Sequence, residues 1–415
     1  MFGYSAALPQ IMRGCGIPYF ATQKITWGYN DGDPFPYNDF LWQGIDGSQV
    51  LAHVFHGYGY ETSPKHLIEA WTGRAQRSDT TGLMLPFGYG DGGGGATREH
   101  LEYLRRAHNL EGAPRTRMAP PIKYFEDLER RRMTLPRYVG ELYFQAHRGT
   151  YTSQARTKLL NRRAEVALRE TEFWTSTAAV LAGVAAPLAD LDSAWKRLLT
   201  NQFHDILPGS SIGRVYEEAE KDLAEVVALA GDMTRAAINA LVTDSSRGAI
   251  TVFNSLSFTR RALLTIPAGG SVTDVMGVPL MTQRHDRQRL VEVTIPPCGW
   301  TTVRTGQLQE ATPDDAIPVT ESEVRALSTD EGWILENARI RAAFNATGEL
   351  TSLWDKESAS EWMTEPGNVF RMYKDVPRAW DAWDIDSNYA SMPVILDQRA
   401  IVEVTAEGPL LACLR

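Results

Sequence analysis

The hydrophobic pattern divides the chain into three regions of different periodicity. From Phe2 to about Arg117, short apolar runs alternate with helical stretches, which is typical of βα units. In the second region apolar positions recur three and four residues apart, which predicts long helices joined by short turns. The remainder has short β-rich runs between Gly, Pro, Asn and Asp. The predicted fold class is multidomain: a partial (β/α)-barrel-like α/β domain at 1–134, a three-helix bundle at 135–243 and a large antiparallel β-sandwich at 244–415.

One predicted helix carries candidate chemistry at its end. Its apolar stripe spans residues 191–206, and a Pro-Gly pair stops it. Asn201, His204 and Asp205 share a neighbouring stripe, because they are three and four residues apart. An imidazole, a carboxylate and an amide on one rigid helix end suit a metal ion or a sugar hydroxyl. The alternative is a polar helix edge with a satisfied histidine.

Composition and charge exclude several classes of protein. The 415 residues carry a net charge of −9 without a long basic run, which argues against a nucleic-acid or anionic-membrane partner. No apolar run is long enough to span a bilayer. Cys15, Cys298 and Cys413 are odd in number and far apart, which argues against disulfides and a cysteine metal site and favours a reducing cytoplasm.

Two further segments concentrate side chains that suit sugar binding. In the first, donors, acceptors and a carboxylate are denser than a solvated face requires, although charged residues also often flank helices. The second, KDVPRAWDAWDIDSNY, offers aromatic faces that stack on sugar rings and carboxylates that bind hydroxyls, with packing as the equal alternative for its tryptophans. The residues concerned are Glu141, Tyr143, His147, Arg148 and Tyr151 in the first segment and Trp383, Asp384 and Asp386 in the second.

Polar residues near the predicted first strands have two interpretations. Asp39, Trp42 and Asp46 follow a strand that ends at Thr22 and could face a ligand, although turn structure explains most such residues. His53 and His56 lie three apart in a predicted strand, which directs their rings to opposite faces. We therefore expect both histidines to be structural or to support a site without contacting its ligand.

A glycine-rich loop keeps a different class of function open. Gly88, Gly90 and Gly93 satisfy GxGxxG before a helix predicted from about Thr97, and Glu111 lies near the place of a ribose-binding acid. A nicotinamide-dependent oxidoreductase is therefore an alternative, although no second βαβ pattern accompanies the loop. A third hypothesis is a non-catalytic carbohydrate-binding protein, carried by the β region.

Four motifs in order along the chain resemble those of the α-mannosidases of glycoside hydrolase family 38, in their cytosolic and bacterial branch. They are FGYGDGGGG, GELYFQAHRGTYTSQA, NQFHDILPGSSI and the WDAWDID segment. The resemblance implies that His204 is a ligand of an active-site zinc ion and that Asp205 binds the sugar. It also implies that Asp91, in the glycine-rich motif, lies at the rim of the mannose pocket.

The same resemblance suggests roles for the remaining candidates. Glu141 is the candidate for the acid near the leaving group, although Gln145 stands where the family often has an acid. His147, Arg148 and Tyr151 are expected to contact the sugar. Trp383 and Asp384 belong to a segment that, in the family, reaches back toward the active site.

The resemblance further implies a retaining mechanism on terminal α-mannosides of oligosaccharides. Zinc would bind two mannose hydroxyls, an aspartate nucleophile would form a glycosyl-enzyme, and a second carboxylic acid would protonate the leaving oxygen. In the family, the nucleophile and the other zinc ligands belong to segments upstream of FGYSAALPQ. We therefore expect these 415 residues to be an incomplete piece with little or no activity of their own, and a homo-oligomer is left open.

Overall fold

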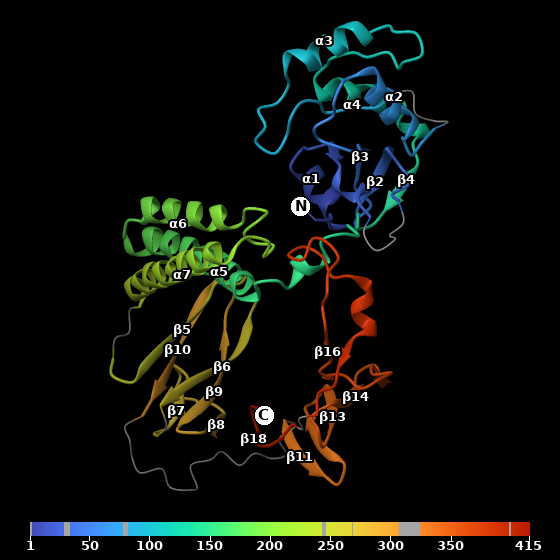
Figure 1. Ribbon diagram of the computed structural model, residues 1–415. Coiled ribbons are helices and arrows are strands. Elements are labelled where there is room, and N and C mark those ends of the chain that lie inside the picture. Colours follow the sequence, from blue (N-terminus) through green and yellow to red (C-terminus); the bar gives the residue numbers. More distant parts are fainter. Residues whose placement is uncertain are drawn as a thin grey trace. The chain divides into compact units, whose positions relative to one another are not determined.

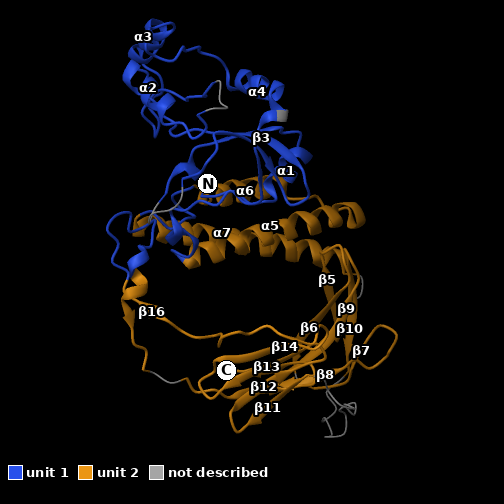
Figure 2. Cartoon of the chain, turned by 90° about the vertical axis from the view of Figure 1, so that its right-hand side faces the viewer, with its two compact units in different colours: residues 1–154, 204–211, 375–388 blue, residues 155–203, 212–374, 389–415 orange. Residues whose placement is uncertain are grey.

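The computed structural model describes residues 2–28, 34–77, 82–242, 246–267, 269–306, 324–397 and 400–415 (Figure 1). The chain forms two compact units, which Figure 2 colours separately. Unit 1 comprises Met1–Gln154, His204–Ser211 and Asp375–Asn388, and unit 2 comprises Ala155–Phe203, Ile212–Lys374 and Tyr389–Arg415. Each unit is therefore assembled from stretches that are far apart in the sequence.

The units differ from the domains predicted by the hydrophobic pattern. Residues 135–154, which that pattern assigned to the helical bundle, belong to unit 1. They join unit 1 because Leu142 is buried and exchanges two backbone hydrogen bonds of 3.0 Å with Tyr4, near the start of the chain. The predicted boundary between residues 243 and 244 lies outside the described residues.

The core of unit 1 is a four-stranded sheet in the order β1-β3-β2-β4. β1 is parallel to β3 and β2 is parallel to β4, but β2 and β3 are antiparallel. A turn at residues 44–48 joins β2 to β3 and is too short for the crossover that parallel strands require. The described strands therefore form no closed barrel, and their mixed directions differ from a (β/α) arrangement. The strands are β1 (Tyr19–Thr22), β2 (Asp39–Gln43), β3 (Gln49–Val54) and β4 (Arg137–Val139).

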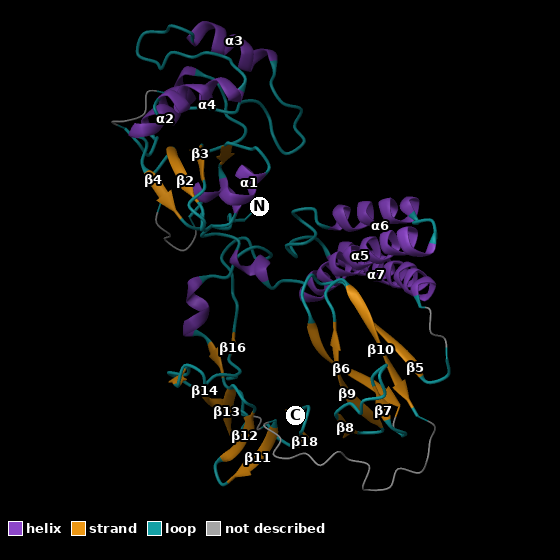
Figure 3. Ribbon diagram, turned by 180° about the vertical axis from the view of Figure 1, so that it is seen from behind, coloured by secondary structure: helices purple, strands orange, loops and turns teal. Residues whose placement is uncertain are grey.

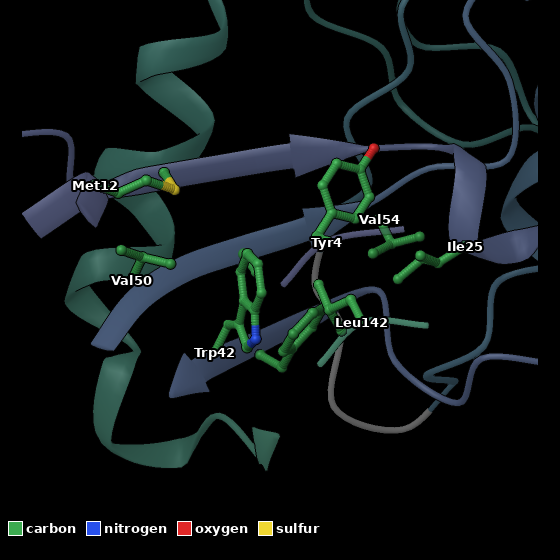
Figure 4. Close-up of a cluster of buried hydrophobic side chains, with 9 residues drawn as sticks. Tyr4, Met12, Ile25, Trp42, Val50, Val54 and Leu142 are labelled. Carbon is green, nitrogen blue, oxygen red and sulfur yellow. The ribbon is translucent and has the colours of Figure 1, made fainter. Parts of the chain in front are cut away.

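Both faces of this sheet are covered. Figure 4 shows Tyr4, Trp42 and Val50 in one hydrophobic cluster, which also contains Met12 of helix α1 (Leu8–Gly14). Alternate residues of β2 and β3 point to the other face, where Leu51 packs against helix α4 (Pro121–Arg130). The predicted strand that ends at Thr22 and the predicted strand that carries His53 are confirmed.

Three residues in and after β2 could have faced a ligand according to the sequence. The structure places two of them in the core and the third in a turn. Trp42 is fully buried and donates a hydrogen bond of 2.7 Å to the carbonyl of Gly140. Asp39 is buried as well. Asp46 closes the exposed turn by accepting hydrogen bonds of 2.9 and 2.7 Å from Ser48. Asp39 and Trp42 are therefore buried in the core, and Asp46 shapes a turn.

A buried polar cluster joins the sheet to α4. Nδ1 of His53 lies 2.7 Å from Oδ1 of Asp39, and the phenol of Tyr124 lies 2.9 and 3.0 Å from the two Asp39 oxygens. Burial and the negative charge of Asp39 raise the pKa of Tyr124, so the phenol stays protonated and donates. His53 is therefore structural, as predicted.

The other helices of unit 1 flank the glycine-rich loop. α2 (Pro64–Thr72) and α3 (Arg98–Ala107) share a small core in which Leu67 meets Leu104. Thr97 caps α3, because its hydroxyl accepts from the backbone of His100 while the His100 ring accepts from the backbone of Thr97. The predicted start of this helix is confirmed.

Unit 2 contains the three predicted long helices, which lie side by side in Figures 1 and 3. They are α5 (Ala155–Ala182), α6 (Leu188–Asn201) and α7 (Gly213–Leu241), and their shared core includes Leu168, Leu198 and Leu223. None of the described helices has the length and apolar character needed to cross a bilayer.

α6 ends earlier than predicted. The side chain of Asn201 is buried and donates to the carbonyl of Arg197 at 3.0 Å and to Oδ2 of Asp222 on α7 at 2.7 Å. The helix therefore closes at Asn201. His204 and Asp205 lie in the turns that follow and not on the helical stripe that spacing predicted.

The rest of unit 2 is antiparallel β-structure in all the pairings that the structure describes. The sheets β5-β10-β7 and β6-β9-β8 share one core, which contains Val291, Val293 and Ile295. Leu290 is buried as well.

The strands of unit 2 have the following bounds: β5 (Ala249–Asn254), β6 (Arg260–Pro267), β7 (Val272–Thr273), β8 (Thr282–His285), β9 (Gln288–Ile295), β10 (Gly299–Thr305), β11 (Arg325–Thr329), β12 (Gly332–Glu336), β13 (Ile340–Asn345), β14 (Leu350–Asp355), β15 (Ser360–Glu361), β16 (Met372–Tyr373), β17 (Pro393–Val394), β18 (Val404–Glu407) and β19 (Ala412–Leu414). Strands β11 to β15 form a five-stranded sheet, and β16-β17 and β18-β19 form two short pairs.

Removal of the Tyr124 phenol tests the buried cluster. Tyr124→Phe deprives the Asp39 carboxylate of a donor, and we expect it to lower the free energy of unfolding by about 1–3 kcal/mol. The control is Tyr58→Phe, whose ring is half-exposed, with an expected change within about 0.5 kcal/mol. Urea unfolding followed by tryptophan fluorescence compares the two variants, and equal midpoints would contradict the role given to this cluster.

Candidate functional site

Lys24 follows the first strand of unit 1 and packs against a tryptophan ring. It begins the short helix η1 (Lys24–Thr26) after β1, and its Nζ lies 3.7 Å from the centre of the Trp27 ring. Burial lowers the pKa of Lys24, and the negative charges of Asp91 and Asp205 oppose this shift. Both carboxylates are therefore within electrostatic reach of one ammonium group.

His147 lies next to this group inside a cage of aromatic rings. Its ring centre lies 4.7 Å from that of Trp383, 5.0 Å from Phe2, 5.1 Å from Phe144 and 6.0 Å from Trp27. Burial lowers the pKa of His147, the carboxylate of Asp384 opposes this shift, and the charge of Lys24 adds to it. The imidazole is therefore neutral at pH 7.

Asp384 holds the turn that carries His147. Its Oδ1 accepts from the backbone N–H of His147 and, at 3.3 Å, of Arg148, while its Oδ2 lies 3.4 Å from Nδ1 of His147. These bonds offset the strain of a left-handed backbone at His147, where φ is +61°. Because the Asp384 side chain is only 2% exposed, it has little surface left for a sugar. The structure gives it a positioning role in place of the predicted substrate contact.

The segment around Asp384 is fixed at two more points. The N–H of Gly149 donates to the carbonyl of Trp383 at 2.9 Å, and a Cβ at Gly149 would lie 3.1 Å from that carbonyl oxygen. Asp386 is buried and accepts from the backbone and the guanidinium of Arg378 at 2.9 and 3.1 Å. The buried carboxylates of Asp384 and Asp386 therefore fix the backbone of this segment, and the Trp383 ring contacts His147.

His204 and Asp205 lie in an accessible turn. Nε2 of His204 is 3.8 Å from Oδ2 of Asp205, and the two side chains are 62% and 44% exposed. The carbonyl of Asp205 accepts from the Ser211 hydroxyl at 2.6 Å. Gly209 has a φ of +91° and lies so close to Ser153 that a Cβ there would be 2.7 Å from the Ser153 Cβ. The turn is thus docked against the chain that follows His147.

Four residues of the predicted sugar-binding segment form a more exposed cluster. The Arg148 guanidinium carbon lies 5.9 Å from the centre of the Tyr143 ring. Burial raises the pKa of Tyr151, the charges of Tyr143 and Glu141 add to this rise, and Arg148 opposes it. The His147 ring, by contrast, packs among the aromatic rings of the cage.

The glycine-rich loop does not have the setting of a dinucleotide site. Tyr89 and Gly95 exchange backbone hydrogen bonds of 2.8 and 2.9 Å, which closes the loop with Asp91 exposed at its tip. The fingerprint requires a strand directly before the loop. Among the described residues, the preceding run forms only an isolated bridge between Tyr60 and Phe87. The oxidoreductase alternative therefore loses its structural basis.

The part of the chain that the structure describes does not form a metal site by itself. In it, no three His, Cys, Asp or Glu side chains come together to hold an ion. His204 and Asp205 offer two potential ligands, whereas a catalytic zinc ion normally takes three from the protein. No chemical step is therefore assigned to a metal here.

Lys24 and Trp27 were not predicted as site residues. No motif marks them, and a lysine beside a tryptophan is common in surface loops. The available signal was their place, since they directly follow a strand that ends at Thr22, where α/β proteins often build their sites. Phe2, which closes the aromatic cage, had no sequence signal.

Three family models match successive parts of the chain. They are the Glycosyl hydrolases family 38 N-terminal domain at residues 1–141, the Alpha mannosidase middle domain at residues 145–241 and the Glycosyl hydrolases family 38 C-terminal domain at residues 335–415. The order of the three agrees with the order of the sequence motifs.

Curated relatives and solved structures give the same result. The chain is 36% identical over 417 residues to Alpha-mannosidase 2C1 of Mus musculus and 31% identical over 443 residues to Alpha-mannosidase G of Dictyostelium discoideum. Each match covers 99% of this chain but only 38% and 40% of the relative, so the chain spans about two fifths of their length. The fold matches the crystal structure of an alpha-mannosidase from Enterococcus faecalis V583 with a TM-score of 0.71, at 16% identity, over 100% of this chain and 53% of that one.

The pairing of Asp384 with His147 can be measured by titration. Asp384→Asn keeps an oxygen that accepts from the backbone but removes the charge that favours the imidazolium, so we expect the pKa of His147 to fall further below its ordinary value. NMR of the histidine ring nitrogens gives this pKa directly. His108, exposed on the same unit, is the internal control and should not shift. An unchanged or higher pKa at His147 would remove Asp384 as its electrostatic partner.

Proposed function

Because this chain belongs to glycosyl hydrolase family 38, we propose that its function is the hydrolysis of terminal α-linked mannosyl residues in oligosaccharides. The relatives that it matches are named alpha-mannosidases and are longer than this chain, so the activity, its substrate and its partners are proposed from them. A mannose-containing oligosaccharide is the proposed substrate, and unpaired cysteines at positions 15, 298 and 413 support a cytoplasmic location.

The observation that carries this proposal is the match of three α-mannosidase family models, in succession, to residues 1–141, 145–241 and 335–415. The aromatic cage around His147 and the accessible side chains of His204 and Asp205 supply groups of the kinds that bind sugars. Carboxylates accept from sugar hydroxyls, and aromatic rings pack against the apolar faces of sugars. A surface built from these groups suits a monosaccharide unit better than an anionic cofactor.

The proposed reaction retains the configuration at the anomeric carbon and uses two carboxyl groups. Glu141 is the proposed acid, which protonates the leaving oxygen, and its accessibility beside Tyr151 and Arg148 supports this role. No described residue is assigned as the nucleophile. His204 is proposed as one zinc ligand; a bound zinc ion would orient sugar hydroxyls. His147, Arg148, Tyr151 and Trp383 are proposed to line the sugar site.

The role of His204 can be tested by substitution in the full-length protein. If His204 is a zinc ligand, His204→Ala lowers both the zinc content and the hydrolysis of 4-nitrophenyl α-mannoside, with a loss of about 100-fold or more in kcat/KM. The matched control, His108→Ala, removes an exposed imidazole from the same unit and should change neither. Unchanged zinc content in His204→Ala, measured by mass spectrometry, would exclude it as a ligand.

The acid role of Glu141 predicts a dependence on the leaving group. Glu141→Gln should reduce turnover of an alkyl mannoside, which needs a proton on its leaving oxygen, by about 100-fold or more. An activated dinitrophenyl mannoside, which needs no such proton, should be affected much less. The control is Glu69→Gln, an exposed carboxylate on α2. Equal losses for the two substrates would assign Glu141 to binding and not to acid catalysis.

The alternative functions make different predictions in the same preparation. Thermal stabilisation by NAD would favour the oxidoreductase. Mannoside binding that is unaffected by a zinc chelator and is not accompanied by hydrolysis would favour a carbohydrate-binding protein.

A further inference from the structure

A groove runs along α3 in unit 1, and none of its lining residues belongs to the proposed sugar site. Its volume is about 860 Å³, which is within the range of ligand-binding clefts. One wall is the helix and the other is the loop that follows it. The groove extends from Arg98 to His108, which is about 15 Å of helix length. Figures 1 and 3 show this helix apart from the four-stranded sheet.

The two walls of the groove are joined by a hydrogen bond. Arg98, Leu101 and Arg105 recur at intervals of three and four residues, so they share the face of α3 that forms the first wall. Leu104 lies beside them and is buried. The hydroxyl of Thr116 in the loop donates to the carbonyl of Leu104 at 3.2 Å, which holds the second wall against the helix.

Large apolar side chains in this groove are accessible to water. Leu101 on the helix is 44% exposed, and Met118 on the loop is 56% exposed. Single exposed apolar residues are common on protein surfaces, whereas apolar groups that gather in one concave place with a polar rim mark a binding surface. Leu101 and Met118 meet the second description.

Cations surround the apolar groups, although the whole chain has a net charge of −9. Arg98, Arg105 and Arg117 line the groove, and Glu102 is the one acid among its described lining residues. The Glu102 carboxylate is already neutralised by two arginines of its own helix, at 2.7 to 2.9 Å. Arg117 is 70% exposed and lies 3.6 Å from Asp127, which does not line the groove. The groove is therefore locally positive on an acidic protein.

The combination of apolar floor and positive rim restricts the chemistry of a partner. A small anion would bind the arginines but leave Leu101 and Met118 in water. A purely apolar segment would cover the floor but would remove guanidinium groups from water without pairing them. An acidic amphipathic peptide segment satisfies both, because its apolar side chains fill the floor and its carboxylates bind guanidinium groups.

We propose that the groove along α3 is a docking site for an acidic amphipathic segment of a partner protein. An apolar side chain of the segment packs between Leu101 and Met118, and its carboxylates bind Arg98 and Arg117. This interaction goes beyond the proposed hydrolase function, because it uses none of the residues of the proposed sugar site. Its success or failure is therefore independent of mannoside hydrolysis.

Binding of a synthetic peptide to the full-length protein tests the proposal. The probe is a fluorescein-labelled peptide of glutamate and leucine at helical spacing, about three helical turns long. Fluorescence anisotropy should show saturable binding. Peptides with lysine in place of glutamate, or serine in place of leucine, should bind about ten-fold more weakly or worse. Absence of saturable binding, or equal affinity for the leucine and serine peptides, would overturn the proposal.

Substitutions in the groove provide the second measurement. Arg98→Glu combined with Arg117→Glu should weaken peptide binding by about ten-fold or more, because two attractive charges become repulsive. Met118→Glu should weaken it as well, because the apolar contact is lost. The matched control is Arg13→Glu, which reverses an exposed charge on α1 and should not change the affinity. All four side chains are exposed, so thermal unfolding should be unchanged, and equal affinity in every variant would refute the docking site.

Hydrogen exchange followed by mass spectrometry locates the bound peptide. The peptide should slow amide exchange several-fold in residues 98–118 and leave α1 unchanged. Protection confined to other parts of the protein would place the peptide elsewhere and refute the proposal. Self-association of the protein that Met118→Glu abolishes would assign the groove to a second copy of this chain and would also overturn it.

Discussion

The two oxygens of Asp384 connect segments that are 237 residues apart in the chain. A buried carboxylate is costly unless donors converge on it, and here two backbone N–H groups and an imidazole do so. In return, the carboxylate stabilises a left-handed residue at His147, which would otherwise be strained. The aromatic cage depends on that backbone conformation, because it directs the imidazole toward the rings of Phe2, Trp27 and Trp383.

A second buried carboxylate, in the core of unit 1, is also stabilised by donors that converge on it. The carboxylate of Asp39 tolerates burial because the phenol of Tyr124 on α4 and the imidazole of His53 on β3 both reach it. Both aspartates lie in stretches rich in aromatic residues, where a ligand-facing loop is an equally natural interpretation. The difference between a structural and a substrate-binding aspartate is decided by the donors that surround it. Those donors come from distant segments, so a local sequence window does not contain them.

This explains which parts of the structure were predictable. Residues 155–182 and 213–241 were recognisable as helices because their apolar spacing repeats over many turns, and Thr97 was recognisable as a cap from its chemistry. β2 was missed because its five residues stand between Pro-rich and Gly-rich turns. The end of α6 was misplaced because Asn201 bonds to α7, which is a tertiary contact. Lys24 belongs to no motif, and its packing against Trp27 emerged only from the folded arrangement.

The interleaved composition of unit 1 has a consequence for its biosynthesis. A ribosome releases His147 long before Asp384, because 237 residues separate them and all of α5, α6 and α7 lie in between. Until the last of the three stretches emerges, the nascent polypeptide exposes the rings around His147 without the segment that covers them. Such surfaces are the ones that chaperones recognise, and closing so long a loop is slow. The aromatic cage around His147 is therefore among the last features of unit 1 to be completed.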